Sequence, residues 1–166
     1  MQIALSSIES PLGEIAFAAT RDGLCALELK FTKDEIRARV CARCPDAEFR
    51  EEPLGEIAAK LRAYFAGDLA AIDGIPVDLC GTDFQKEVWA ALRRIPVGTT
   101  WTYAQLAREV GRPKAMRAVG AANGQNPVAL VVPCHRVVRT GGNLGGYAGG
   151  LDLKAWLLRH EGARLA

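Results

Sequence analysis

The stretch VALVVPCHRVV, residues 128–138, is the most informative part of the sequence, because an apolar run is followed directly by a cysteine, a histidine and an arginine. Residues 130–132 are apolar and β-prone, so they predict a buried strand that would hold the following residues rigidly. Pro133 has no N–H and is expected to end the pairing of that strand. Cys134 and His135 therefore place a nucleophile beside a base at the end of a strand.

Cys134 has the neighbours of an activated thiol. The thiolate is the nucleophilic form of cysteine, and a nearby histidine or arginine favours that charged form. Side chains that are adjacent on an extended strand point to opposite faces, so a water or a kinked backbone must connect Cys134 with His135. The alternative is that Cys134 is a small buried hydrophobic residue, which is the common role of an unpaired cysteine.

Length and composition indicate a compact intracellular protein. The 166 residues are 49% apolar and 24% charged, which suits one two-part protein or two small domains. No apolar run reaches the roughly 20 residues that span a bilayer, and the start MQIALSSIES lacks the basic and apolar regions of a signal peptide. Five cysteines without framework-like spacing fit a reducing compartment. We expect a cytoplasmic protein with no membrane partner.

The small net charge of +2 hides an asymmetry between the two halves of the chain. Residues 1–78 carry 9 basic and 14 acidic side chains, a net charge of −5, whereas residues 79–166 carry 12 basic and 5 acidic side chains, or +7. Clustered cations supply the sequence-independent part of nucleic-acid affinity, so the basic half that holds Cys134 suggests a polyanionic partner. The alternative is a merely soluble basic surface.

The first eighty residues predict a small antiparallel sheet with two helices. Thr32 and Glu35 form a capping-box pattern at the start of one helix, and Gly67 follows the end of the other. Residues 21–23 form the turn of a hairpin. The elements expected here are strands over residues 2–7, 13–19, 24–30 and 75–79 and helices over residues 32–44 and 54–65. A domain boundary near residue 80 fits the change in charge.

The second half predicts mainly helices. Capping boxes recur at Thr82 with Gln85 and at Thr102 with Gln105. The helices expected are those that start at Thr82 and end by Pro96, and those over residues 103–110, 113–123 and 151–161, the last with a buried stripe of Leu151, Ala155 and Leu158.

The helices over residues 103–110 and 113–123, joined by a short glycine-containing turn, form a helix-turn-helix pattern. Lys114 and Arg117 lie one turn apart on the second helix, and Tyr103 begins the first, where free N–H groups favour phosphate. The small residues of the second helix permit close approach to a DNA groove. The alternative is a helical hairpin in which small residues serve tight packing.

Two features follow the cysteine. The glycine-rich segment TGGNLGGYAGG, residues 140–150, lacks the Lys and Ser or Thr of a phosphate-binding P-loop, so it predicts a mobile wing or the rim of a pocket. Glu161 lies at the negative end of the last helix, where a carboxylate is unfavourable without a partner. His135 is a candidate partner, and the alternative is a solvated terminal carboxylate.

The motifs NPVALVVPCHRVVRTGGNLGGYAGGLDLKAWLLRHEG (126–162), TYAQLA (102–107) and RPKAMRAVGAANGQNP (112–127) resemble the O6-alkylguanine-DNA alkyltransferases, which repair DNA by direct reversal. SPLG at residues 10–13 fits the N-terminal domain of that family. The resemblance implies an α+β fold: a ribonuclease H-like α/β domain with a small antiparallel sheet over residues 1–80, and a winged helix-turn-helix domain over residues 81–166 that binds DNA and accepts the alkyl group.

The resemblance also implies roles for individual residues. Cys134 would accept the alkyl group, His135 would activate it through water, Glu161 would orient His135, and Asn126 would brace the turn beneath the site. Tyr103 would contact the phosphate of the target nucleotide, and Arg117 would fill the gap left when that nucleotide rotates out of the stack. The other residues implied are Lys114 and Gln105 for DNA binding and Tyr103, Val137, Tyr147, Ala148 and Gly149 for the base pocket.

The expected reaction is a single irreversible transfer from O6-alkylguanine, or O4-alkylthymine, in double-stranded DNA, because a thioether on Cys134 is too stable to hydrolyse. No cofactor is expected, and the protein is expected to act as a monomer that can cluster on DNA. Gly149 leaves room for alkyl groups larger than methyl. A zinc site built from Cys41, Cys44, Cys25 and Cys80 is the less favoured interpretation, since neither histidine lies in the N-terminal half.

Two other functions remain open at this point. A binding-only member of the same scaffold would recognise alkylated DNA and recruit other factors, but such proteins lack the acceptor that Cys134 provides. A cysteine hydrolase that uses Cys134 and His135 would need an oxyanion hole and a deacylating water, and would turn over many times. Neither the helix-turn-helix pattern nor the basic half is explained by a hydrolase.

Overall fold

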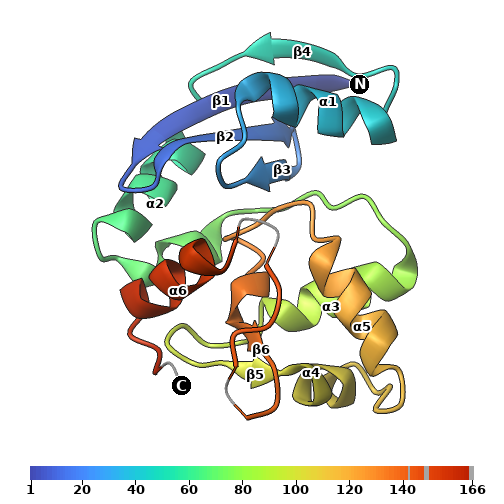
Figure 1. Cartoon of the computed structure of the whole chain (residues 1–166). Helices are drawn as coiled ribbons and strands as arrows, with labels where there is room; N and C mark the ends of the chain where they lie inside the picture. The colour runs from blue at the N-terminus through green and yellow to red at the C-terminus, as the bar shows by residue number, and fades with distance from the viewer. Residues whose placement is uncertain (142, 148–149, 165–166) are drawn as a thin grey trace. The chain divides into compact units, whose positions relative to one another are not determined.

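The computed structural model describes residues 1–141, 143–147 and 150–164 and divides the chain into two compact units (Figure 1). The N-terminal unit comprises Met1–Cys80 together with Pro127–Val131, and the C-terminal unit comprises Gly81–Asn126 together with Val132–Ala166. The chain therefore returns to the N-terminal unit for five residues directly before the cysteine segment. The sequence alone did not predict this return.

The N-terminal unit contains a four-stranded sheet in the order β3-β2-β1-β4. The strands β1 (Gln2–Ser10), β2 (Gly13–Thr20) and β3 (Gly23–Glu28) form the predicted antiparallel meander, with Ser10 paired to Gly13 and Thr20 to Gly23 at its two turns. The strand β4 (Glu48–Glu51) adds to β1 in parallel and makes the sheet mixed. It was not predicted, because four mostly exposed residues carry no apolar alternation.

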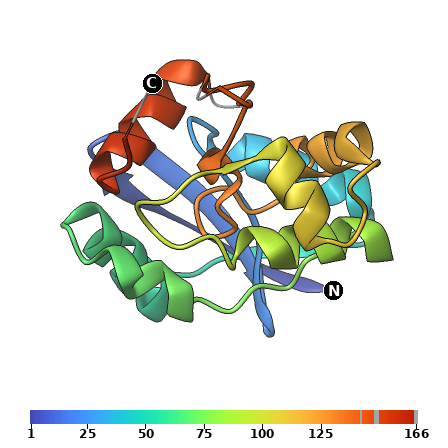
Figure 2. The same ribbon diagram turned by 90° about the horizontal axis from the view of Figure 1, so that it is seen from below.

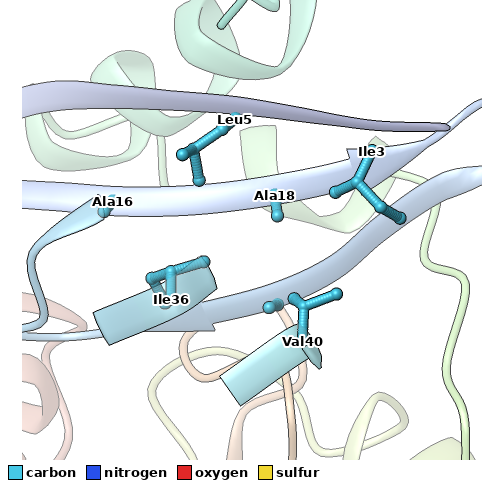
Figure 3. Close-up of a cluster of buried hydrophobic side chains, with 7 residues drawn as sticks. Ile3, Leu5, Ala16, Ala18, Ile36 and Val40 are labelled. Atoms are coloured by element: carbon cyan, nitrogen blue, oxygen red, sulfur yellow. The ribbon is translucent and has the colours of Figure 1, made fainter. Parts of the chain in front are cut away.

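One face of the sheet is covered by α1 (Lys33–Arg43), which starts at the predicted capping box of Thr32 and Glu35. Figure 3 shows Ile36 and Val40 pointing from α1 toward the apolar side chains of the strands. The cluster consists of Ile3, Leu5, Ala16, Ala18, Ala26, Ile36 and Val40. Small alanines on β2 and β3 let the helix approach the sheet closely, so the core forms between them.

The remaining elements of this unit are α2 (Gly55–Phe65) and the 3₁₀ helix η1 (Leu69–Gly74). The strand predicted over residues 75–79 is wrong: only Val77 bridges the sheet, through Leu24. Pro76 cannot donate to a ladder, and its carbonyl accepts from the N–H of Leu24 at 2.9 Å. Gly23 fits here because a Cβ would lie 2.6 Å from the Pro76 carbonyl carbon.

The C-terminal unit is mainly helical, with a two-stranded parallel sheet formed by β5 (Trp101–Thr102) and β6 (Val137–Val138). Its helices are α3 (Asp83–Leu92), α4 (Tyr103–Glu109), α5 (Met116–Gly124) and α6 (Leu151–His160). Both predicted capping boxes form, at the starts of α3 and α4. The helices α3 and α5 lie side by side (Figure 1) and are tied by a hydrogen bond from Trp89 Nε1 to the Ala122 carbonyl at 2.8 Å; Figure 2 shows the same ribbon from below.

Three predictions for the second half of the chain need correction. The helix predicted from Pro113 starts at Met116, because residues 112–115 form a turn closed by the Ala115 N–H and the Arg112 carbonyl, so Lys114 precedes the helix. Leu151 is exposed rather than buried, and the buried face of α6 comprises residues 153–155, 157 and 158. Residues 130–132 are not a strand but part of a series of turns. No helix within the described residues has the length and apolar character that crossing a membrane requires.

Candidate active site

The turns before Cys134 are tight. Pro133 has φ −82° and ψ 65°, and the Cys134 N–H donates to the Val132 carbonyl at 2.8 Å, which defines an inverse γ-turn. The Asn126 side-chain amide donates to the same Val132 carbonyl at 2.7 Å. Buried β-branched residues thus adopt a kinked path, and Cys134 begins a short 3₁₀ helix, η2 (Cys134–Arg136), instead of ending a strand. The kinked backbone was one of the two alternatives that the sequence left open.

His135 and Glu161 form a buried pair. The His135 Nε2 atom lies 2.8 Å from a Glu161 carboxylate oxygen, and both side chains are fully enclosed. His135 follows Cys134 on η2, whereas Glu161 caps the end of α6, so the pair ties the cysteine turn to the last helix. The solvated alternative for Glu161 is thereby excluded.

Arg136 completes this cluster. Its guanidinium donates from Nε to one Glu161 oxygen at 2.8 Å and from Nη2 to the other at 3.0 Å, while Nη1 donates to the Ile95 carbonyl at 2.8 Å. A two-pronged contact of this kind combines charge with fixed geometry. From the sequence Arg136 was expected only as a cation near Cys134, and its contact with the Glu161 carboxylate was not predicted.

The cluster determines which histidine nitrogen carries a proton. Burial raises the pKa of the Glu161 carboxyl, but the hydrogen bonds from His135 and Arg136 outweigh burial and bring it to about 2. Burial lowers the pKa of His135 and outweighs the opposing effect of Glu161. At neutral pH the carboxylate is therefore ionised and accepts the Nε2–H of a neutral imidazole. The Nδ1 atom of His135, which has no hydrogen-bond partner among the described residues, then holds a lone pair.

Tyr103 lies close to the cysteine. The pairing of Thr102 with Val138 places the start of α4 beside the end of β6. Burial and the negative charge of a Cys134 thiolate raise the pKa of the Tyr103 hydroxyl, and the amide of Asn123 hydrogen-bonds to it. The ring packs near Gly120 of α5, where a Cβ would lie 3.6 Å from a ring carbon. Gly120, one of the small residues of α5, therefore serves packing against Tyr103. Tight packing was the alternative interpretation of the small residues in this helix.

Lys154 is a buried cation that sequence reasoning missed. Its ammonium donates to the carbonyls of Val137 at 2.6 Å and Gly146 at 3.2 Å, and also to that of Leu144. Burial lowers its pKa to about 8. Lys154 lies three residues after Leu151 and four before Leu158, so it falls within a helical stripe that was expected to be apolar. This position was the sequence signal for a buried lysine. Lys154 fastens the glycine-rich segment to α6.

The remaining predicted residues take different positions. Lys114, Arg117 and Gln105 are exposed, and the Gln105 side chain accepts from the Thr102 N–H in the capping box. Val137 is buried and Tyr147 is half-buried. Ala148 and Gly149 lie outside the described residues. Within the described ranges, no three His, Cys, Asp or Glu side chains gather as a metal site would require.

Comparisons with known proteins identify the family. The ribonuclease-like domain of 6-O-methylguanine DNA methyltransferase matches residues 3–79, and the DNA-binding domain of the same family matches residues 83–163. The chain belongs to the 6-O-methylguanine DNA methyltransferase family. A methylated-DNA–protein-cysteine methyltransferase of Methanosarcina acetivorans is 46% identical over 156 residues, which cover 93% of this chain and 96% of the relative.

A second relative matches less of its own length. The methylated-DNA–protein-cysteine methyltransferase of Shigella flexneri is 58% identical over 108 residues, which span 65% of this chain and 63% of that protein. Among solved structures, OGT of Mycobacterium tuberculosis in complex with DNA has a TM-score of 0.81 and 38% identity, covering 96% of this chain and 92% of that one. The expected α+β fold and the family resemblance are confirmed.

The buried cluster of this family member predicts a loss of stability in acid. An unfolded chain binds a proton at His135 below about pH 6.5 and at Glu161 below about 4.5, whereas the folded pKa values of both groups are lower. The unfolded state therefore binds more protons, and stability falls as pH decreases through each window. All three tryptophans (Trp89, Trp101, Trp156) lie in the C-terminal unit, so tryptophan fluorescence reports on it.

We expect the urea midpoint followed by tryptophan fluorescence to fall between about pH 7.5 and 5.5, and again below about pH 4.5. The variant His135→Gln should lose the first decrease and keep the second. The other histidine, His160, is present in both proteins, so the comparison isolates the change at position 135. A wild-type midpoint that stays constant from about pH 7.5 to 4 would contradict this account.

Proposed function

We propose that this chain repairs DNA by transferring the alkyl group of O6-alkylguanine to Cys134 in one irreversible step. The observation that carries the proposal is the fully buried chain of Arg136, Glu161 and His135, which ends on the turn that presents Cys134. Such an arrangement resembles the nucleophile, base and orienting group of covalent catalysis. The names of the relatives, methylated-DNA–protein-cysteine methyltransferases, support the same chemistry.

The proposed first step moves a proton. Glu161 holds the imidazole of His135 with its proton on Nε2, so Nδ1 can accept the thiol proton of Cys134 through a bridging water. The Glu161 carboxylate stabilises the imidazolium that forms, and Arg136 holds that carboxylate in place. Asn126 serves as the brace that keeps Cys134 on its turn through the Val132 carbonyl.

The second step moves the alkyl group. The thiolate sulfur attacks the carbon attached to O6, the new C–S bond forms as the C–O bond breaks, and guanine leaves with the bonding electrons. The hydroxyl of Tyr103, whose raised pKa keeps it protonated, is placed to donate a hydrogen bond to the departing base. The thioether has no leaving group that water could displace readily, so each molecule reacts once.

The substrate must leave the DNA stack, because an O6 substituent inside a duplex cannot reach a cysteine that is 8% exposed. We propose that Arg117 of α5 fills the gap in the duplex while Tyr103 contacts the rotated nucleotide. Lys114 and Gln105 add contacts to DNA near the helix-turn-helix. The base pocket is proposed to include the Val137 carbonyl and the segment Tyr147, Ala148 and Gly149, where Gly149 admits alkyl groups larger than methyl.

Further parts of the proposal concern the whole protein. Residues 1–80 act as a supporting α/β domain, and residues 81–166 bind DNA and accept the alkyl group without a cofactor or metal. O4-alkylthymine in duplex DNA is a second substrate. The protein works in the cytoplasm on chromosomal DNA as a monomer that can cluster along the duplex.

The number of turnovers tests this proposal. Excess duplex DNA with an isotopically labelled O6-methyl group should transfer label until one methyl is bound per protein molecule, and the reaction should then stop. A sample pre-reacted with unlabelled substrate is the matched control and should take up none. Continued release of a labelled small molecule would favour a cysteine hydrolase, and label that stays on tightly bound DNA would favour a binding-only protein.

A further inference from the structure

An open hollow of about 630 Å³ lies beside the candidate active site. Its lining includes Tyr103, Arg117, Gly120, Arg139 and Gly146. Its described lining contains two guanidinium groups and no carboxylate. A hollow with this composition is suited to an anionic group that lies next to a planar base.

Arg139 is held at the edge of this hollow by its own segment. It directly follows β6, and its backbone N–H donates to the Asn143 carbonyl at 2.8 Å. Gly145 adopts φ +74°, and a Cβ there would lie 3.3 Å from Arg139 Cγ and 3.4 Å from the Tyr103 hydroxyl oxygen. The stem of Arg139 and the ring of Tyr103 therefore pack against the same glycine.

The charge of Arg139 is available to a ligand. Within residues 1–141, 143–147 and 150–164, Arg139 makes no ion pair with a carboxylate. The charge of Arg139 lowers the pKa of the Tyr103 hydroxyl, against the raising effects of burial and of a Cys134 thiolate. An arginine with a fixed stem and an unpaired head is well suited to bind phosphate through two hydrogen bonds.

We propose that Arg139 binds a backbone phosphate of the extruded nucleotide in the hollow that Arg117 also lines. This inference rests on the proposed function, because it assumes that a nucleotide enters the hollow. Arg117 then acts in the duplex that the nucleotide leaves, whereas Arg139 acts on the nucleotide after it has rotated. Arg139 is a positioning residue and takes no part in the proton or alkyl transfer.

A substrate without phosphate separates this role from a structural one. We compare the single-turnover rates of the wild type, Arg139→Gln, Arg139→Lys and Arg62→Gln on duplex DNA containing O6-methylguanine and on the free nucleoside O6-methyl-2′-deoxyguanosine. Arg62 is exposed on α2 of the other unit and controls for the loss of one positive charge. Arg139→Gln should react about tenfold more slowly with duplex DNA and at the wild-type rate with the nucleoside. Arg139→Lys should recover part of the loss.

The salt dependence of binding provides the second measurement. In a Cys134→Ala background, the slope of log affinity against log salt should be smaller by about 0.9 for Arg139→Gln, as expected for one lost phosphate contact, and unchanged for Arg62→Gln. Equal losses on DNA and nucleoside would overturn the inference in favour of a structural role. A wild-type rate on DNA would also overturn it while leaving the proposed function intact. If the wild type alkylates itself from neither substrate, the proposed function fails instead.

Discussion

Replacing Arg136 by methionine is expected to lower the free energy of unfolding of the C-terminal unit by about 3–5 kcal/mol. The guanidinium is 3% exposed and holds both oxygens of the fully buried Glu161. Methionine fills a similar volume but leaves a buried carboxylate with only His135 beside it. The cost arises from that uncompensated charge and not from lost packing.

Urea unfolding followed by tryptophan fluorescence measures this effect in the C-terminal unit. Arg94→Met is the matched control: Arg94 lies 3.8 Å from Glu109, but both side chains are about half exposed, so its loss should cost no more than about 1 kcal/mol. The double variant Arg136→Met with Glu161→Leu removes both charges and should regain most of the stability. Equal, small effects of Arg136→Met and Arg94→Met would show that the buried cluster does not stabilise the fold.

Replacing His135 by glutamine is expected to slow alkyl transfer by about 10²–10⁴-fold, the usual contribution of a positioned general base. Glutamine can still donate a hydrogen bond to Glu161, so the change removes the base and keeps the fold. The wild-type rate should be constant from about pH 8 down to pH 6.5 and fall only at lower pH, because the pKa of His135 lies below its ordinary value.

The experiment is a single-turnover time course with duplex DNA containing O6-methylguanine. His160→Gln is the control, since His160 is the other histidine of the chain and stacks on Trp156 in α6. That variant should react at the wild-type rate. A His135→Gln protein that keeps a third or more of the wild-type rate would remove His135 from the proposed mechanism.

Local sequence signals predicted much of the fold. The capping boxes at Thr32, Thr82 and Thr102 each begin a helix, because a side chain three residues away satisfies the cap within the same segment. The unfavourable position of the Glu161 carboxylate at a helix C-terminus made His135 a candidate partner, and the family resemblance implied the pairing that the structure contains. These features depend on neighbouring residues and simple electrostatics.

Features that depend on distant contacts were not predicted. The strand β4 forms only because β1 offers an open edge. The apolar residues 130–132 predict a strand by propensity, yet turns prevail there, and Leu130 adopts φ +73°. Arg136 and Lys154 gain their partners from Glu161 and from carbonyls of the glycine-rich segment, and no spacing within the sequence specifies such contacts.

The position of the transferred methyl group shows whether Cys134 is the acceptor. The protein is incubated with duplex DNA that carries an isotopically labelled O6-methyl group, and its peptides are then mapped by mass spectrometry. We expect one label on the peptide that contains Cys134, with unmodified guanine left in the DNA, and no label on the variant Cys134→Ala. Label on Cys25, Cys41, Cys44 or Cys80, or label that remains on the DNA, would contradict this expectation.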